Sequence, residues 1–366
     1  MDVNPRKRKG SRRRATLKEV ASAAGVSPAT VSNAYNRPDQ LSPEVRERVV
    51  ETARRVGYAG PDPMARGLRR RRAGAVGVLY EDRLSYAFAD PAAVLFLQGV
   101  SVATEEAGLG LLLLSGAPRE ERDPEAVTGA VVDGFVVYSM SRDDPLVNAA
   151  LERRFPAVVV DQPRLEELPF VGIDDEGAAR SAAEHLIELG HRRFGVISFA
   201  ISPDPIGGLV DLERRKTAVY EVTGSRLRGY AKTLEASGIS WPEVPIYEQY
   251  ENAPEAGRTA AAELLSREPR PTAILCLSDQ LALDALEAAR SMGLSVPEDL
   301  SIVGFDDVPE AARATPSLTT IHQPHVEKGR LAGQLLISRL KGEDPPSPEL
   351  LSTRLVIRES TDRANS

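Results

Sequence analysis

The spacing of apolar residues along the chain changes at about residue 74. Before that point they recur every three or four positions, which predicts helices, and afterwards short apolar runs alternate with amphipathic segments. The runs predict buried strands at 75–80, 110–114, 133–138, 157–161, 194–199, 273–277 and 301–306. The segments between them predict helices at 91–107, 177–189, 226–237, 256–267, 279–291 and 325–340. This alternation favours an α/β fold class with two parallel sheets, each covered by helices on both faces.

Capping signals divide residues 16–58 into three short helices. Three pairs of residues carry the signals of a helix start: Thr16 with Glu19, Ser27 with Pro28, and Ser42 with Pro43. Two glycines supply the positive φ of a helix end: Gly25 and Gly57. Two short helices joined by a Gly-containing turn can place a recognition helix in the major groove of DNA, although small three-helix units without a DNA role carry the same caps.

Length, composition and cysteine count limit the kinds of protein that this chain can be. The chain has 366 residues, 42% of them apolar and 27% charged, which predicts two or three domains with sizeable interiors. The sequence contains no run of eighteen apolar residues and no pattern of a secretory signal, so we expect a cytoplasmic protein without a membrane partner. Its one cysteine, Cys276, excludes an intrachain disulfide and a multi-cysteine metal cluster, and its apolar neighbours predict a buried thiol.

The net charge of −7 is distributed unevenly. Residues 1–72 contain 18 Lys and Arg against 7 Asp and Glu, a net charge of +11, which leaves −18 for residues 73–366. A basic head on an acidic body is typical of a protein whose head binds nucleic acid, although a basic tail on an enzyme gives the same totals. Within the head, residues 1–14 predict a disordered basic arm that adds phosphate contacts at most.

The motifs of common enzyme classes are missing from the sequence. It has no GxGxxG after a strand, no P-loop, no HExxH and no GxSxG. Four histidines are present, none with a nucleophile at a diagnostic spacing: His185, His191, His322 and His325. We therefore expect a protein that is not an enzyme and uses neither a cofactor nor a metal.

Two strings resemble the DNA-binding headpiece of the lactose/galactose repressor (LacI/GalR) family of bacterial transcriptional regulators: TLKEVASAAGVSPATVSNAYN and LSPEVRERVVETARRVGY. The resemblance continues through DDEGAARSAAEHLIELGHRR, SDQLALDAL and VPEDLSIVGFDD with PSLTTI, so it spans residues 15 to about 358. It implies a repressor that binds double-stranded operator DNA and is controlled allosterically by a small molecule. The alternatives are a sugar-transport component and a DNA-binding protein without a small-molecule effector.

The resemblance also implies a domain organisation. It consists of an all-α helix-turn-helix headpiece, a hinge helix and a two-lobed core similar to periplasmic binding proteins, with parallel sheets. We expect the basic arm at 1–14, the headpiece at 15–60, the hinge at 61–73 and the core at 74–366. The N-terminal lobe of the core is expected at about 74–174 plus 323–345, and the C-terminal lobe at about 175–321 plus 350–358.

The resemblance assigns several headpiece residues to DNA. Base contacts are implied for Pro28, Ala29, Ser32, Asn33 and Asn36. Phosphate contacts or capping are implied for Thr16, Ser27 and Thr30. An Asn side chain can bond adenine through two hydrogen bonds, worth about 1–3 kcal/mol of discrimination, although Asn33 could instead bond the backbone. Many relatives carry a basic residue at this position, so we expect an unusual half-site.

Residues 63–69 resemble the hinge helix of the family, which folds on the operator and inserts a pair of leucines into the minor groove. This implies a wedge role for Leu68 and a backbone contact for Arg66, although one extra residue in 59–61 separates the hinge from the headpiece. A leucine pair and a pseudo-palindromic operator both require two-fold symmetry, so we expect a homodimer. No leucine heptads follow Ser360, which gives no basis for a tetramer.

The core is expected to hold its effector in a cleft at the carboxyl ends of strands. Carboxylates, guanidinium groups and aromatic faces suit a polyol, so a carbohydrate is the implied effector, with nucleosides and nucleobases as the alternative. The candidate residues are Tyr86, Phe88, Tyr138, Asp161, Arg226, Tyr250, Asn252, Ser278, Asp279 and Asp306. An aspartate after a strand is also a common helix cap. The stretch 200–223 is longer than the family norm and either covers the pocket or forms a mobile surface loop.

Overall fold

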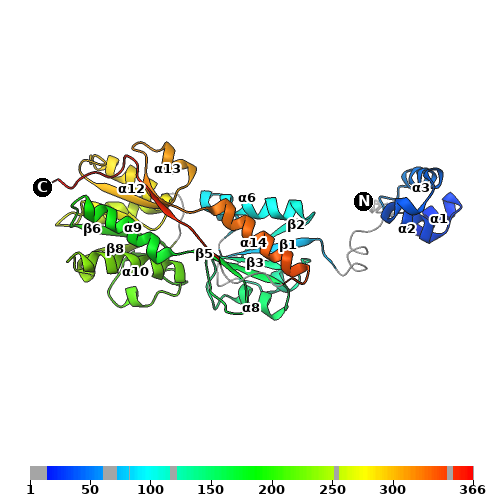
Figure 1. Cartoon of the computed structure of the whole chain (residues 1–366), viewed down its shortest axis with the longest axis horizontal. Helices are drawn as coiled ribbons and strands as arrows, with labels where there is room; N and C mark the ends of the chain where they lie inside the picture. Colours follow the sequence, from blue (N-terminus) through cyan, green and yellow to red (C-terminus); the bar gives the residue numbers. More distant parts are fainter. Residues whose placement is uncertain are drawn as a thin grey trace, which may run out of the picture. The chain divides into compact units, whose positions relative to one another are not determined.

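The computed structural model describes residues 15–60, 72–81, 83–115, 122–250, 255–343 and 349–365. The chain divides into two compact units, residues 1–73 and residues 74–366 (Figure 1). The predicted basic arm and residues 61–71 of the predicted hinge, including Arg66 and Leu68, lie outside the described residues. No helix of the described part is long and apolar enough to cross a membrane.

The described residues of the first unit form the three predicted helices. They are α1 (Leu17–Ala24), α2 (Pro28–Asn36) and α3 (Pro43–Val56), with a 3-10 turn, η1 (Pro38–Gln40), before α3. Every predicted cap is present, including the capping box at Thr16 and the left-handed φ angles of 65° at Gly25 and 76° at Gly57. One fully buried valine from each helix, Val20, Val31 and Val49, lies where the helices meet and forms the centre of this small core.

The described residues of the second unit form two sheets. The first has the strand order β12-β5-β4-β3-β1-β2, and all its neighbouring strands are parallel. Its strands are β1 (Ala75–Tyr80), β2 (Gly110–Ser115), β3 (Phe135–Tyr138), β4 (Ala157–Val160), β5 (Phe170–Ile173) and β12 (Glu349–Leu351). Its helices are α5 (Leu84–Ala87), α6 (Pro91–Glu106), α7 (Glu125–Thr128), α8 (Pro145–Glu152) and α14 (His325–Leu340). One face packs against α6 and α14 and the other against α7 and α8, so successive strand residues are buried.

The second sheet has the strand order β13-β11-β10-β9-β6-β8-β7. Its strands are β6 (Phe194–Ser198), β7 (Gly208–Leu209), β8 (Ile246–Glu248), β9 (Ala273–Cys276), β10 (Ser301–Asp306), β11 (Thr319–His322) and β13 (Arg354–Val356). Its helices are α9 (Asp175–Glu188), α10 (Glu221–Ala236), α11 (Ala256–Leu265), α12 (Asp279–Ser291) and α13 (Pro309–Arg313), with the 3-10 turns η3 (Arg214–Lys216) and η4 (Trp241–Glu243). Helices α9 and α10 cover one face, and α11 and α12 cover the other.

The predicted elements are present, with ends that differ by a few residues. The strands outside the predicted apolar runs are short: β5, β7, β8, β11, β12 and β13. The predicted parallel sheets are present, and the antiparallel pairs in the described part are those of the two edge strands of the second sheet, β7 with β8 and β13 with β11. The last passage between the lobes falls after Leu351 and not before residue 350, because β12 pairs with β5 in the first sheet.

Helices α6 and α14 lie side by side over the first sheet (Figure 1). Gly99 of α6 and Gly329 of α14 each face the backbone of the other helix. A Cβ atom on Gly99 would overlap the carbonyl oxygen of Val326, and one on Gly329 would overlap that of Phe96. The two backbones can approach this closely only because both positions are glycine.

This packing predicts that Gly329→Ala destabilises the core. Because both overlapping groups are main-chain atoms, the helices must separate, and we expect a loss of about 1–3 kcal/mol in the free energy of unfolding. Urea denaturation of the full chain measures the loss. Gly110→Ala is the matched control, since the nearest atom to its new Cβ would lie at an ordinary 3.6 Å. Equal stability of the two variants would contradict the proposed close contact.

Candidate functional site

Helix α2 presents one polar face away from the core of the headpiece. Val31 and Ala34 are buried among residues of α1 and α3. The residues predicted to read bases lie on the opposite side at helical spacing: Pro28, Ala29, Ser32, Asn33 and Asn36. The first two are exposed and the other three are half-buried. Asn36 Nδ2 donates to Ser32 Oγ at 3.2 Å, so these two polar groups are already oriented within the face.

The hydroxyl groups at the starts of α1 and α2 are engaged in capping. Ser27 Oγ accepts from the Thr30 N–H at 3.0 Å and lies 2.9 Å from Thr30 Oγ1. Thr16 Oγ1 accepts from the Glu19 N–H at 3.3 Å. The structure thus places these residues at helix N-termini, where the main-chain N–H groups favour anions, and their phosphate contacts stay a prediction.

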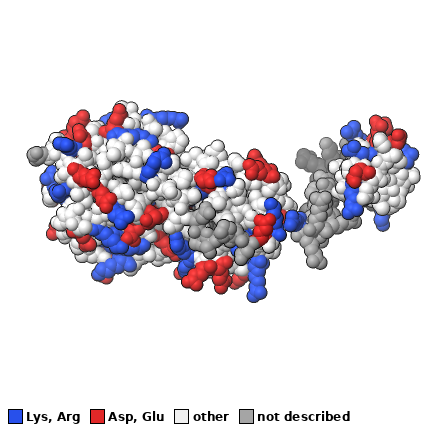
Figure 2. Space-filling view, viewed as in Figure 1, with Lys and Arg blue, Asp and Glu red and all other residues white. Residues whose placement is uncertain are grey.

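Most of the positively charged residues of the first unit belong to the sequence segments before and after its three helices. Between residues 15 and 60 the sequence holds six Lys or Arg and five Asp or Glu, so the described headpiece is nearly neutral. The flanking segments 1–14 and 61–72 hold twelve Lys or Arg and two Asp or Glu. Figure 2 accordingly shows both signs of charge on the described headpiece. Phosphate attraction is therefore expected to come mainly from the flanking segments.

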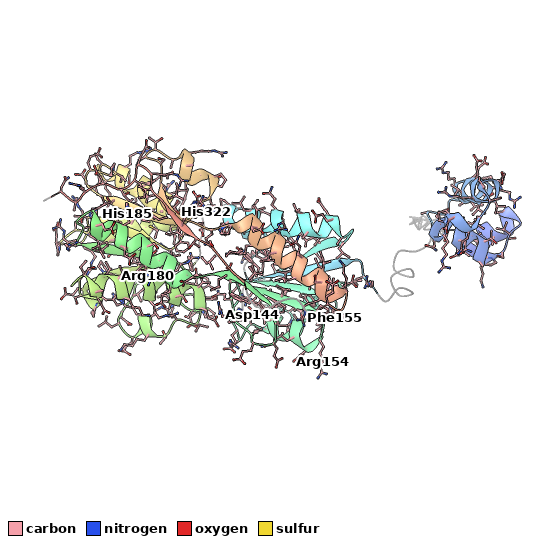
Figure 3. All side chains as sticks on the ribbon, in the orientation of Figure 1. Asp144, Arg154, Phe155, Arg180, His185 and His322 are labelled. Atoms are coloured by element: carbon pink, nitrogen blue, oxygen red, sulfur yellow. The ribbon has the colours of Figure 1, made fainter. Side chains whose placement is uncertain are left out.

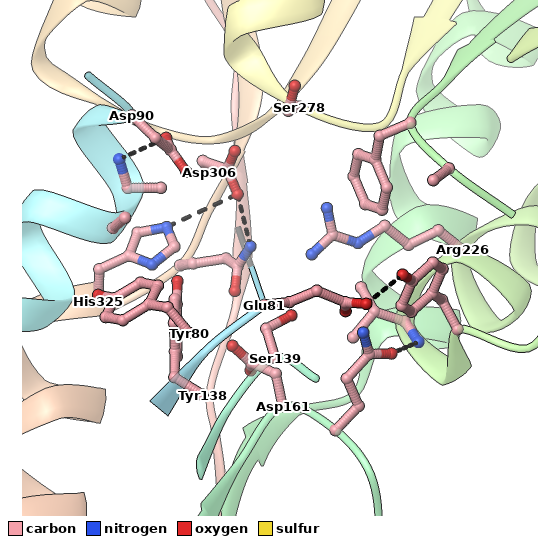
Figure 4. A pocket seen from close by; sticks show the side chains of 18 of the residues that line it. Tyr80, Glu81, Asp90, Tyr138, Ser139, Asp161, Arg226, Ser278, Asp306 and His325 are labelled. Atoms are coloured by element: carbon pink, nitrogen blue, oxygen red, sulfur yellow. Dashed lines mark hydrogen bonds and ion pairs between the residues drawn. The ribbon is translucent and has the colours of Figure 1, made fainter. Parts of the chain in front are cut away.

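A pocket in the second unit lies between the two sheets, at the carboxyl ends of strands from both (Figure 4). The first lobe contributes Tyr80, Glu81, Asp90, Ala92, Ala93, Arg122, Tyr138, Ser139, Asp161 and Gln162. The second lobe and the passage between lobes contribute Phe199, Ala200, Pro203, Tyr220, Val222, Arg226, Tyr250, Ser278, Asp306, Gln323 and His325. The cavity has a volume of about 190 Å³ and lies where the effector was predicted.

Six of the predicted effector residues line this pocket: Tyr138, Asp161, Arg226, Tyr250, Ser278 and Asp306. Two others do not. Phe88 follows the last residue of α5 and is 63% exposed, and Asp279 is fully buried because its carboxyl faces Val308 and Thr320. The Tyr86 side chain and Asn252 lie outside the described residues.

Several lining residues were missed in the sequence. Glu81 and Ser139 directly follow strands and Gln162 is the second residue after β4, so their place at the carboxyl ends was a usable signal. Arg122 lies in an irregular segment and carries no periodic signal, while His325 was considered only as one of four histidines without a nucleophile at a diagnostic spacing. The stretch 200–223 supplies Pro203, Tyr220 and Val222 to the wall, which favours the first of its two predicted roles.

Arg226 is held by partners within its own lobe. Its Nε donates to Asp175 Oδ1 at 2.8 Å, and its Nη1 donates to the Leu277 carbonyl at 2.5 Å. The guanidinium also stacks on Phe305, with 3.6 Å between its central carbon and the ring centroid. Burial raises the pKa of Asp175, and the charge of Arg226 opposes this rise. The arginine is therefore rigid and presents an oriented cation at the pocket wall.

A chain of hydrogen bonds joins the two lobes beneath the pocket. Lys328 is 1% exposed, and its Nζ donates to Asp161 Oδ1 at 2.7 Å and to Gln323 Oε1 at 2.8 Å. Gln323 Nε2 in turn donates to Asp306 Oδ1 at 2.7 Å. Asp161 follows β4 of the first lobe and Asp306 ends β10 of the second, so the chain spans both sheets.

A second set of contacts joins the lobes at another part of the wall. Tyr220 Oη donates to Glu81 Oε1 at 2.6 Å, and the Val222 N–H donates to Gln162 Oε1 at 3.0 Å. Arg122 donates to the main-chain carbonyl of Glu81 at 2.9 Å. Arg122 also forms an ion pair with the fully buried Asp144, which Figure 3 labels. The start of α10 is thereby held against the first lobe.

Asp279 has an unusual protonation equilibrium. Its carboxyl accepts from the Val308 N–H at 2.9 Å and bonds the Thr320 hydroxyl. Burial, with the nearby Asp306 carboxylate as the second cause, raises the pKa of Asp279 to about 8. The raised pKa favours the protonated form of this buried carboxyl, which accepts from the Thr320 hydroxyl group.

The raised pKa predicts a pH-dependent stability. Because the folded state binds the Asp279 proton more tightly than the unfolded state, the free energy of unfolding falls as the pH rises from about 4 to about 8. Asp279→Asn keeps one donor and one acceptor and removes the titration, so it should reduce this fall by on the order of 1 kcal/mol or more. Urea denaturation at pH 5 and pH 8.5 measures it, with the exposed Glu213→Gln as control. Parallel losses in wild type and Asp279→Asn would refute the assignment.

The comparisons with known families and structures agree with this geometry. Residues 16–60 match the family described as bacterial regulatory proteins, lacI family, and residues 183–361 match the periplasmic binding protein-like domain. An HTH-type transcriptional regulator of Mycobacterium tuberculosis is 47% identical over 348 residues, which cover 94% of this chain and 96% of that protein.

Two solved structures extend the likeness over nearly the whole chain. A complex of the transcriptional regulator CelR with cellobiose has 33% identity and a TM-score of 0.68, covering 95% of this chain and 100% of the other. A lac repressor dimer bound to operator and the anti-inducer ONPF has 25% identity and a TM-score of 0.75, covering 96% and 100%. The chain therefore belongs to the LacI family of bacterial transcriptional regulators and is a DNA-binding regulator, not an enzyme.

Proposed function

We propose that this regulator is a repressor that binds a pseudo-palindromic operator as a homodimer and is controlled by a carbohydrate bound in the core pocket. The observation that carries the proposal is the pocket itself. Oriented carboxylate, guanidinium and amide groups surround it together with aromatic rings, at the carboxyl ends of both sheets. The cellobiose complex of CelR supports a sugar as the ligand class.

The size of the pocket favours a single ring as the effector. Its volume of about 190 Å³ is only slightly above the roughly 150 Å³ of an engineered protein cavity that holds benzene. Tyr138 stacks on Phe96 with 4.0 Å between ring centroids and lines the cavity, so it offers a fixed aromatic surface to the apolar side of a sugar ring. A monosaccharide or a similar monocyclic polyol fits these dimensions.

An exposed apolar surface of the first lobe supports dimerisation. Val94 and Val102 of α6 and Leu112 of the edge strand β2 are exposed although all three are apolar. The lac repressor structure is a dimer bound to operator, and its likeness covers almost the whole of this chain. Two-fold pairing through α6 and β2 would give the symmetry that a pseudo-palindromic operator requires.

The polar face of α2 supports a direct reading of bases by Asn33. We expect Asn33→Ala to lower the preference for one base pair of each half-site by about 1–3 kcal/mol and to leave nonspecific binding intact. Competition binding with a randomised operator library measures this change. Glu51→Gln on α3 is the control, and a variant with unchanged sequence preference would remove Asn33 from base recognition.

The positive charge of the arm, residues 1–14, predicts that its loss lowers DNA affinity without changing sequence preference. Deleting residues 1–14 removes seven Lys or Arg and should weaken operator and nonspecific binding alike. The slope of log affinity against log salt concentration should become shallower, while the preferred sequence stays the same. An unchanged slope would mean that the arm makes no phosphate contacts.

The effector itself can be found by a thermal-shift screen of sugars, sugar phosphates, nucleosides and nucleobases. A ligand at about 100 times its dissociation constant adds about 2.7 kcal/mol to the stability of the native state, which raises the melting temperature by several degrees. Asp306→Ala should abolish the shift and Glu213→Ala should preserve it. A hit must also change operator affinity to count as an effector. If no compound does so while operator binding persists, the small-molecule part of the proposal fails.

A further inference from the structure

The polar groups of the pocket differ in whether the protein already satisfies them. Arg226 and Gln162 bond partners from the protein, as described above, and Glu81 accepts from Tyr220. By contrast, Tyr80 Oη and both ring nitrogens of His325 have no hydrogen-bond partner among the described residues. Both side chains are nonetheless at least nine-tenths buried, with exposures of 4% and 5%.

These unsatisfied groups lie together in the pocket. Tyr80 ends β1 and His325 begins α14, and Figure 4 shows the two rings on the side of the pocket opposite Arg226. Buried polar atoms of native proteins nearly always have a partner, and leaving them unpaired is unfavourable. Three such atoms at one wall indicate that a bound molecule supplies the missing hydrogen bonds.

The wall around these groups is negative. Four carboxylates line the pocket, and two guanidinium groups face them: Glu81, Asp90, Asp161 and Asp306 against Arg122 and Arg226. Arg122 is paired with the buried Asp144, and Arg226 with Asp175. Lys328 behind the wall is committed to Asp161. The lining therefore carries more negative than positive charge, and each lining guanidinium already has a carboxylate partner, which disfavours the binding of a phosphate.

We propose that His325 and Tyr80 select the effector by hydrogen bonding neighbouring hydroxyl groups of an uncharged polyol, and that the pocket rejects phosphorylated ligands. A neutral imidazole offers one donor and one acceptor, which matches a hydroxyl group. His325 Nε2 lies 3.6 Å from Asp306 Oδ1, too far for a hydrogen bond, so a ligand hydroxyl can bond His325 and the next hydroxyl can reach Asp306. This inference rests on the proposed function, since it specifies the ligand class of the same pocket.

The position of Tyr80 is fixed by its aromatic neighbours. Its ring meets Tyr138 edge-on with 5.2 Å between centroids, and Tyr138 is stacked on Phe96 of α6. Its hydroxyl group is therefore held in place before a ligand arrives. The same aromatic stack supports the apolar side of the ligand ring. The positions of the hydroxyl groups at the edge of that ring therefore decide which ligand the pocket selects.

Calorimetric titration of the full-length protein tests the ligand class with matched probes. The pairs are D-glucose with glucose 6-phosphate, D-ribose with ribose 5-phosphate, and other monosaccharides, alditols and cyclitols with their phosphate esters. We expect one uncharged member to bind and its phosphate ester to bind at least about a hundredfold more weakly. A phosphate ester that binds equally well would overturn the inference.

Variants test the two residues with the uncharged polyol that binds most tightly. We expect His325→Leu and Tyr80→Phe each to raise its Kd by about 10- to 100-fold, and His325→Gln, which keeps a donor and an acceptor, to recover part of the loss. His185→Gln is the matched control, because His185 lies on α9 and bonds Thr361, outside the pocket (Figure 3). An unchanged Kd in both His325→Leu and Tyr80→Phe would overturn the assignment.

Monodeoxy analogues of the same polyol distinguish direct contact from a structural role. Removing the hydroxyl group that His325 bonds should weaken binding to wild type but cause no further loss in His325→Leu. If every deoxy analogue loses the same factor in both proteins, His325 does not contact the ligand. If only nucleosides or nucleobases bind and change operator affinity, this inference fails while effector control stands. If no compound binds or changes operator affinity, both this inference and effector control fail.

Discussion

The core depends on one buried lysine at the junction of its two lobes. An ammonium group without partners in a protein interior is strongly unfavourable, so Lys328 must keep both the Asp161 carboxylate and the Gln323 amide oxygen. Gln323 then has its amide nitrogen directed at Asp306. The requirement of one cation therefore fixes the carboxyl ends of β4 and β10 relative to each other, and the pocket is built on those ends.

The contacts at the start of α10 differ in kind from those around Lys328. There the lobes meet through hydrogen bonds with neutral donors, from the Tyr220 hydroxyl to Glu81 and from main-chain N–H groups to Gln162 and Glu221, and through an exposed ion pair between Arg142 and Glu221. Such bonds contribute about 0.5–1.5 kcal/mol each, or somewhat more to a carboxylate. Allosteric coupling in proteins is typically about 1–3 kcal/mol. Breaking the contacts at the start of α10 therefore costs less free energy than separating Lys328 from its partners.

Sequence patterns predicted the parts of the fold that have strong local causes. The caps at Thr16, Ser27 and Gly57, and the continuous apolar strands, appear where the pattern placed them. The two-residue strand β7 and the antiparallel edges did not, because their pairing depends on neighbours far away in the sequence. In the pocket, Asp161 and Asp306 followed from their strands, whereas Arg122 and His325 are defined by tertiary contacts alone. Asp279 has the same local signal as Asp306, yet its carboxyl turns into the core towards Thr320.

Charge and sequence recognition are separated along this chain. The described headpiece is nearly neutral, so α2 alone has little electrostatic attraction to DNA, and under the proposed function it contributes mainly discrimination between bases. Affinity from phosphates must then come from the segments that flank the helices, one of which, 61–72, also connects the headpiece to the core. Under the proposed function, affinity for phosphates and choice of operator are therefore set by different segments of the chain.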